Sequence, residues 1–149
     1  MRKFAGLPPV AALFALCMSS ASANMDITLK VIVDGGTPNT GQIIATLFDS
    51  ETSYMKAPFA EQTNPVDAIG AAVLTFKNLA PGDYAVSVVY DENANGKLDT
   101  GFLGIPKEKI GFSNNAKPRI GPAPYEKARF GLTPETSEIT ITLKRPKRE

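Results

Sequence analysis

The segment from residue 83 to residue 90 constrains the fold of this chain most, because its side chains alternate with a period of two. One face of an extended segment would carry Tyr84, Val86, Val88 and Tyr90. The opposite face would carry Ala85, Ser87 and Val89. A helix would scatter both sets around its axis, whereas a strand separates them cleanly. The pattern therefore predicts a β-strand over residues 83–90.

Further segments show strand patterns separated by turn residues. They cover residues 27–33, 42–48, 71–76 and 138–144, with 128–132 as a further candidate. Residues 42–48 are apolar on both faces, which predicts a position in the middle of a sheet. Residues 49–67 contain Pro58 and Pro65 and are expected to be irregular. Short strands without a long helical period imply an all-β fold, a sandwich or a barrel.

A long connection rich in Gly, Pro and Asn follows the best strand, over residues 91–136. Its aromatic residues argue against disorder, because disordered segments are poor in them. We expect it to fold over one end of the sandwich and to contain one or two short strands. Phe102, Phe112 and Tyr125 are expected to pin it to the core. The alternative is an exposed platform that stacks on a sugar or a peptide.

The N-terminus has the pattern of a secretory signal peptide. Arg2 and Lys3 precede an apolar stretch over residues 10–18, and Ala21-Ser22-Ala23 fits a cleavage site. The sequence thus predicts a signal peptide over residues 1–23, cleavage after Ala23, and one domain over residues 24–149 in the periplasm or outside the cell. The apolar stretch is too short for a stable membrane span. An uncleaved anchor is the alternative, and Leu16 before Cys17 argues against lipoprotein processing.

Residues 24–149 contain neither Cys nor His. This composition excludes disulfides, a thiol nucleophile, an imidazole base and a His-ligated zinc from the mature chain. Without Arg2 and Lys3, 14 Lys and Arg face 15 Asp and Glu, so the formal charge is −1. That balance argues against a nucleic-acid partner and against general binding to anionic membranes.

One motif in the connection indicates a metal site. Residues 91–99 read D-x-N-x-N-G-x-x-D, the first nine positions of a calcium loop of the EF-hand type. Gly96 would permit the sharp bend of such a loop. The predicted calcium ligands are the side chains of Asp91, Asn93, Asn95 and Asp99 and the carbonyl oxygen of Lys97.

The motif departs from an EF-hand, because Phe102 stands where a bidentate Glu is expected. A strand also enters the loop, so a strand-loop site of modest affinity, with a Kd of about 10⁻⁴–10⁻³ M, is the better picture. Glu108, Asp83 or Asp49 could complete the ligand shell. The alternative is a metal-free turn, since Asn-Gly favours hairpins and Asn and Asp bond their own backbone.

Catalytic patterns are weak in this chain. Asp91 and Asp99 could form the carboxylate pair of a glycosidase. The Asn residues between them fit metal binding better, so we expect no enzymatic activity and assign no catalytic residue.

Several segments together resemble the DUF2141 family of bacterial exported proteins, whose function is not established. They are residues 76–86 (FKNLAPGDYAV), 90–93 (YDEN), 103–108 (LGIPKE), 111–115 (GFSNN) and 128–130, followed by a closing strand. The resemblance implies a β-sandwich related to transthyretin-like or carboxypeptidase-regulatory-like domains. Members often carry His before the Asp of the loop, where this chain has Tyr90, and the family supplies no ligand or catalytic residues.

We therefore expect a single antiparallel β-sandwich of transthyretin-like or Ig-like form with the long connection over one end. The expected function is a non-catalytic exported protein, stabilised by calcium, that binds an unknown protein, a glycan or another envelope component. A carbohydrate-binding module is the first alternative, and a hydrolase is the second.

Overall fold

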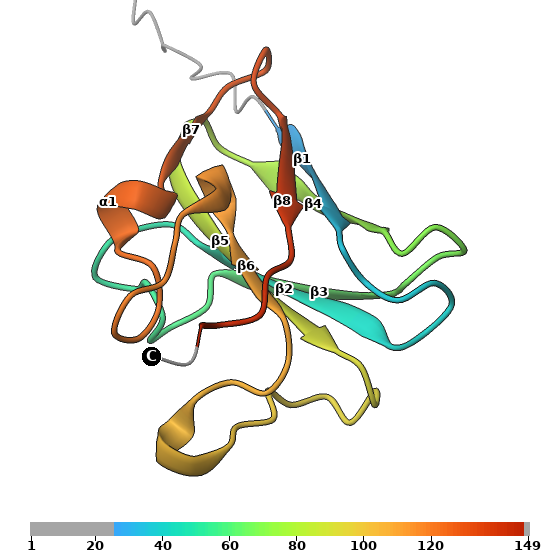
Figure 1. Ribbon diagram of the computed structural model, residues 1–149. Helices are drawn as coiled ribbons and strands as arrows, with labels where there is room; N and C mark the ends of the chain where they lie inside the picture. The colour runs from blue at the N-terminus through green and yellow to red at the C-terminus, as the bar shows by residue number, and fades with distance from the viewer. Residues whose placement is uncertain (1–25, 148–149) are drawn as a thin grey trace, which may run out of the picture.

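The computed structural model describes residues 26–147, and the regular secondary structure there is almost entirely β-strand (Figure 1). The strands are β1 (Ile27–Asp34), β2 (Gln42–Phe48), β3 (Ala60–Pro65), β4 (Ala72–Leu79), β5 (Gly82–Asp91), β6 (Ile110–Phe112), β7 (Phe130–Leu132) and β8 (Glu138–Thr142). The helical segments are one α-helical turn, α1 (Tyr125–Ala128), and two 3-10 turns, η1 (Phe102–Gly104) and η2 (Ser113–Asn115). The expected all-β class is confirmed. The predicted signal peptide lies outside the described residues.

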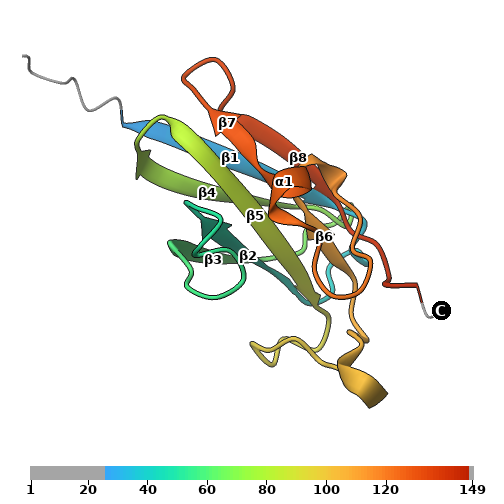
Figure 2. The ribbon, with the colours of Figure 1, turned by 90° about the vertical axis from the view of Figure 1, so that its left-hand side faces the viewer.

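The strands form two sheets. The smaller sheet has the order β4-β1-β8 and the larger one the order β3-β2-β5-β6, with β7 pairing the start of β5. In Figure 2 β5 runs across the length of the molecule at an angle to β1 and β4. β2 lies inside the larger sheet, as its two apolar faces predict.

The main core takes its side chains from both sheets. Along each strand they occupy alternate positions, as the period of two requires. They include Leu29, Val31, Ile43, Leu47, Leu74, Phe76, Val86, Val88, Tyr90 and Ile141. Since residues 26–147 contain no cysteine, this apolar burial is the main source of their stability.

A second apolar cluster covers the opposite face of β5. Ala85 belongs to it, whereas its neighbours Tyr84 and Val86 belong to the main core. The cluster consists of Phe48, Tyr54, Ala85, Phe112, Ala123 and Ala128. The connection after β5 therefore covers the outer face of the larger sheet with its second half, rather than only one end of the fold as expected.

The two sheets are also linked at their sides. Ile110 of β6 and Lys144, just after β8, exchange two backbone hydrogen bonds of 2.9 Å. On the other side, the Asn64 side chain of β3 donates to the carbonyl oxygen of Val73 in β4. These links protect sheet edges that would otherwise offer free backbone groups to other chains.

Three expectations about the strands are wrong in detail. Residues 60–65, expected to be irregular, form the edge strand β3, whose side chains are mostly exposed and so lack an apolar alternation. β8 pairs with β1 in parallel, so the fold is not purely antiparallel. In the 128–132 candidate, the strand begins only at Phe130, because Ala128 ends α1. The connection was expected to contain one or two short strands, and it contains two, β6 and β7.

Gly111 of β6 tests how closely the sheets approach each other. A Cβ atom there would lie 2.6 Å from Ile141 Cγ2 and 2.9 Å from Val88 Cγ2. We expect Gly111→Ala to lower the free energy of unfolding by about 1–3 kcal/mol, the usual cost of overpacking. Urea denaturation would measure the change. Gly131→Ala is the matched control, since its Cβ would meet only Asp83 Oδ1 at 3.9 Å; an equal loss in both variants would contradict this packing.

Candidate functional site

The candidate site lies where β5 ends and the 92–108 loop begins. Both ribbon views show this loop, drawn in yellow to orange, extending beyond the two sheets (Figures 1 and 2). Asp91, the last residue of β5, stands opposite Gln42 at the start of β2. Gly41 allows this close approach: a Cβ atom there would lie 2.5 Å from the Asp91 carbonyl oxygen. The sheet thus fixes the first residue of the loop.

Asp91 is fully buried, and its carboxylate organises the loop. Its Oδ1 accepts the N–H of Asn95 at 3.0 Å. Its Oδ2 accepts the N–H of Gly96 and the side-chain amide of Gln42, each at 2.7 Å. Gly96 has a φ of +77°, which brings the chain around the carboxylate at little steric cost. One side chain thus connects β5, β2 and the bend of the loop.

These contacts keep Asp91 ionised. Burial is the largest influence and would raise the pKa of Asp91, but the hydrogen bonds from Gln42, Gly96, Asn95 and Ala94 together outweigh it. The pKa of Asp91 therefore lies below its usual value. A carboxylate that accepts several N–H groups is a known case of such a shift.

The other predicted side-chain ligands lie together in the loop. The Asn93 amide nitrogen is 2.8 Å from Asp99 Oδ2, and the Asn95 amide nitrogen is 3.0 Å from Asp99 Oδ1. Asn93 Oδ1 accepts the N–H of Asn95, and Asn95 Oδ1 accepts the N–H of Lys97. The loop therefore brings Asp91, Asn93, Asn95 and Asp99 into one network. Lys97 joins it through its N–H rather than through the predicted carbonyl oxygen.

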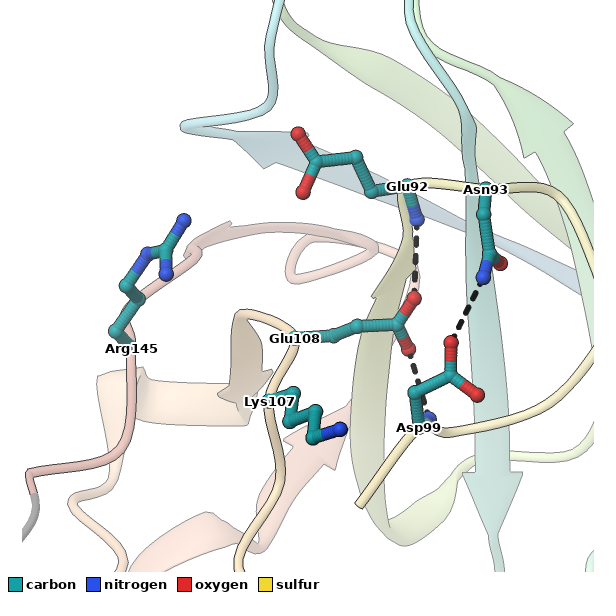
Figure 3. Close-up of a pocket in the computed structure, with 6 residues that line it drawn as sticks. All are labelled: Glu92, Asn93, Asp99, Lys107, Glu108 and Arg145. Atoms are coloured by element: carbon teal, nitrogen blue, oxygen red, sulfur yellow. Dashed lines mark hydrogen bonds between the residues drawn. The ribbon is translucent and has the colours of Figure 1, made fainter. Parts of the chain in front are cut away.

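Glu108 closes the neck of the loop. One of its carboxylate oxygens accepts the N–H of Glu92 at 3.2 Å, and the other accepts the N–H of Asp99 at 3.1 Å (Figure 3). Its side chain is almost fully buried. Of the three carboxylates that were candidates to complete the site, Glu108 alone contacts the loop: Asp49 bonds Ser50 and Ser53, and Asp83 bonds Arg129.

An open hollow of about 320 Å³ lies beside Glu108. Figure 3 shows acidic and basic side chains around it, with Glu108 between Arg145 and Asp99. Its lining residues are Glu92, Asn93, Asp99, Lys107, Glu108 and Arg145. Sequence reasoning missed Gln42, Lys107 and Arg145. Strand pairing brings Gln42 to the loop, and the path of the chain after β8 brings Arg145. Lys107 belongs to the loop itself and is placed beside Asp99 by its N–H, which bonds the Asp99 carbonyl oxygen. No local sequence pattern indicates any of the three.

The aromatic residues of the connection divide between core and surface. Phe112 is buried in the second apolar cluster, and Tyr125 packs against that cluster with its ring 5.5 Å from the ring of Tyr54. Phe102 is instead 89% exposed at the end of the loop. The expected pinning role is confirmed for Phe112 and Tyr125 and is wrong for Phe102.

Residues 26–147 lack two features that bear on metals and on membranes. No group of three or more Asp, Glu, His or Cys side chains in that range is arranged to hold a metal ion. A metal at the loop would therefore depend on Asn and backbone oxygens as well as on carboxylates. Within the same range, no helix combines the length and the apolar character needed to cross a membrane.

Replacing Asp91 tests its role in the loop. Asp91→Asn would place an amide NH₂ group, which is a donor, against the N–H group of Asn95 or of Gly96. It would also remove the negative charge of the carboxylate that accepts these hydrogen bonds. We expect a loss of about 2–3 kcal/mol in the free energy of unfolding at pH 7, the scale of hydrogen bonds to a charged group. Thermal or urea unfolding would measure it, with exposed Glu135→Gln as the control.

The same variant carries a pH signature. Because the folded state lowers the pKa of Asp91, its contribution is complete above the unfolded value of about 3.9 and disappears as the pH falls through the lower folded value. The difference between the wild type and Asp91→Asn should therefore shrink as the pH falls below about 4. A difference that stays constant down to pH 2 would contradict the ionised hydrogen-bonded carboxylate.

One comparison with known proteins identifies a family. Residues 31–140 match the family model described as "Uncharacterized protein conserved in bacteria (DUF2141)". Searches of curated proteins and of solved structures give no match. The matched range runs from β1 to β8 and includes the whole of the 92–108 loop. On the strength of this match, the chain belongs to the DUF2141 family.

Proposed function

We propose that this chain is a non-catalytic protein of the periplasm or the cell exterior that binds calcium at the 91–99 loop and uses that end of the molecule to bind an envelope component. Its two sheets would form a β-sandwich of transthyretin-like or Ig-like form. The observation that carries the proposal is the convergence of Asn93 and Asn95 on Asp99, above a buried Asp91.

The distances within the loop suit calcium. Calcium takes oxygen ligands at 2.3–2.6 Å, so neighbouring oxygens around the ion lie about 3 Å apart. The contacts of Asn93 and Asn95 with Asp99 measure 2.8–3.1 Å. Turning each terminal amide by 180° would place its oxygen where its nitrogen now lies, because the two ends have nearly the same shape. The turn would give up the bonds that the two amide oxygens accept from the N–H groups of Asn95 and Lys97, so binding of the ion has to offset that loss. Calcium would then replace amide hydrogens as the partner of Asp99.

Asp91 can join such a site without losing its present contacts. A carboxylate oxygen has two lone pairs, and Asp91 Oδ1 accepts one N–H in this network. The N–H groups of Asn95 and Gly96 would continue to orient the carboxylate. Two carboxylates and neutral oxygens make a weakly charged shell, which fits a Kd of about 10⁻⁴–10⁻³ M.

The alternatives receive less support from the same residues. A sugar-binding platform would retain only Phe102, because Phe112 and Tyr125 pack on the second apolar cluster. A glycosidase needs one carboxyl group with a raised pKa to act as the acid. The pKa of Asp91 is lowered instead, and its oxygens face backbone N–H groups. These features support a binding role over a catalytic one.

Calcium should raise the thermal stability of the protein. At 10 mM calcium, the Kd above implies a stabilisation of about 1.4–2.7 kcal/mol, or a rise in Tm of about 3–10 °C. Scanning calorimetry with calcium and with EGTA would measure the shift. We expect Asp99→Asn to abolish most of it, whereas Glu135→Gln should retain it. If 10 mM calcium leaves the wild-type Tm unchanged, the metal part of the proposal is wrong.

Export is tested by the mass of the mature protein. A chain recovered from the periplasm or the medium should begin at Asn24, after removal of residues 1–23. Mass spectrometry of the intact protein would distinguish this product from the full chain. A lipid-modified chain that begins at Cys17, or one that retains Met1, would contradict the proposed processing.

A further inference from the structure

A second hollow, of about 560 Å³, lies between η2 and α1. Figure 1 shows the segment that joins these two turns as the orange loop leading into α1. Three of the residues that line the hollow are cationic, none is acidic, and none belongs to the hollow beside Glu108. We call it the basic hollow, and its lining residues are Asn114, Ala116, Lys117, Arg119, Pro124 and Lys127.

The three cations of the basic hollow have no acidic partner within residues 26–147. The side chains of Lys117, Arg119 and Lys127 are exposed and form no ion pair there. Residues 109–125 contain no Asp and no Glu. Since residues 24–149 carry a formal charge of −1, this positive charge is a local excess and not a property of the whole chain.

The carboxylates close to α1 lie around Tyr125, which does not line the basic hollow. Burial raises the pKa of Tyr125, and negative charges raise it further; they belong to Asp83, Glu126 and Glu51. Two of these carboxylates already pair with Arg129, Asp83 at 3.2 Å and Glu126 at 3.4 Å. Acidic and basic groups are thus separated in this region, and the basic hollow is not neutralised from within the protein.

The backbone around the basic hollow is fixed. The Asn114 amide donates to the carbonyl oxygens of Lys127 at 3.2 Å and of Arg129 at 2.7 Å, which joins η2 to α1. The Tyr54 hydroxyl donates to the Ala123 carbonyl oxygen at 2.8 Å. Three prolines restrict the loop between the two turns, Pro118, Pro122 and Pro124. Cations that are held in place before binding capture an anion with a smaller loss of entropy.

We propose that the basic hollow binds a phosphomonoester, a group with about two negative charges and three strong acceptor oxygens. Lys117 and Lys127 supply point charges, and the planar fork of Arg119 suits two phosphate oxygens at once. A carboxylate offers only two oxygens and one charge. A soluble sugar phosphate and a lipid headgroup can present the same dianion. This site goes beyond the proposed function, since it shares no residue with the calcium loop.

Titration calorimetry of the mature protein with glucose 6-phosphate tests the proposal. Low ionic strength is needed, because salt screens exposed charges. We expect the wild type to bind, and Arg119→Gln and Lys127→Gln each to bind roughly tenfold more weakly. Lys77→Gln is the matched control, because Lys77 is also exposed but lies in β4 of the smaller sheet. Glucose without phosphate should not bind.

The charge of the probe gives a second readout. The second pKa of a phosphomonoester is about 6, so the probe loses one charge between pH 7.5 and pH 5. Residues 24–149 contain no His, the side chain that ordinarily changes charge in this range. We expect the affinity for glucose 6-phosphate to fall severalfold over this range. An affinity that stays constant would contradict binding of the dianion.

Vesicles distinguish the two sources of the phosphate. Phosphatidic acid carries a phosphomonoester, whereas phosphatidylglycerol carries a diester with one charge. Binding to phosphatidylcholine vesicles that contain phosphatidic acid, lost in Arg119→Gln, would assign the basic hollow to a lipid headgroup. Binding of glucose 6-phosphate without vesicle binding would assign it to a soluble ester. Either result supports the proposal.

The proposal is overturned if the wild type binds neither probe or if Lys77→Gln weakens binding as much as Arg119→Gln. Equal binding to phosphatidylglycerol vesicles would also overturn it, as would tighter binding of a polyglutamate peptide, which would indicate a carboxylate-bearing partner. An unchanged Tm of Arg119→Gln shows that lost binding is not lost folding. Because calcium takes no part in these measurements, this proposal and the proposed function can fail separately.

Discussion

Burial of both faces of β5 is the constraint on which the rest of the structure depends. One face belongs to the main core, and the other is covered by the second half of the connection through Phe112 and Ala128. Because residues 26–147 contain no cysteine and so no disulfide, the connection must contribute apolar side chains to this cover. Its first half contributes almost none of them, so it is free to form the 92–108 loop beyond the end of the strand.

That loop depends on two buried carboxylates at its base. Asp91 turns the chain at the end of β5, and Glu108 joins the two ends of the loop through the N–H groups of Glu92 and Asp99. Buried carboxylates need several donors to offset the loss of water, and backbone N–H groups supply them here. The base is therefore fixed, while the residues beyond it can serve binding.

The sequence predicted what depends on local patterns and missed what depends on pairing. The alternation over residues 83–90 identified β5, and the D-x-N-x-N-G spacing identified the residues that gather around Asp91 and Asp99. The sequence did not predict β3, because an exposed edge strand is held by backbone hydrogen bonds to β2 and needs no apolar pattern. It did not predict the role of Gln42, because only the antiparallel register places this residue opposite Asp91. The role of Phe102 was predicted wrongly, because residue type alone does not distinguish an aromatic side chain at an exposed tip from one in the core.

The parallel pairing of β1 with β8 makes the smaller sheet depend on distant parts of the chain. β1 opens the described residues, and β8 comes more than 100 residues later, so the smaller sheet lacks one of its three strands until residues 138–142 have been synthesised. Contacts between such distant segments form late and slowly. The export proposed above requires a chain that is still unfolded when it crosses the inner membrane. A topology that withholds one strand in this way would help to meet that requirement.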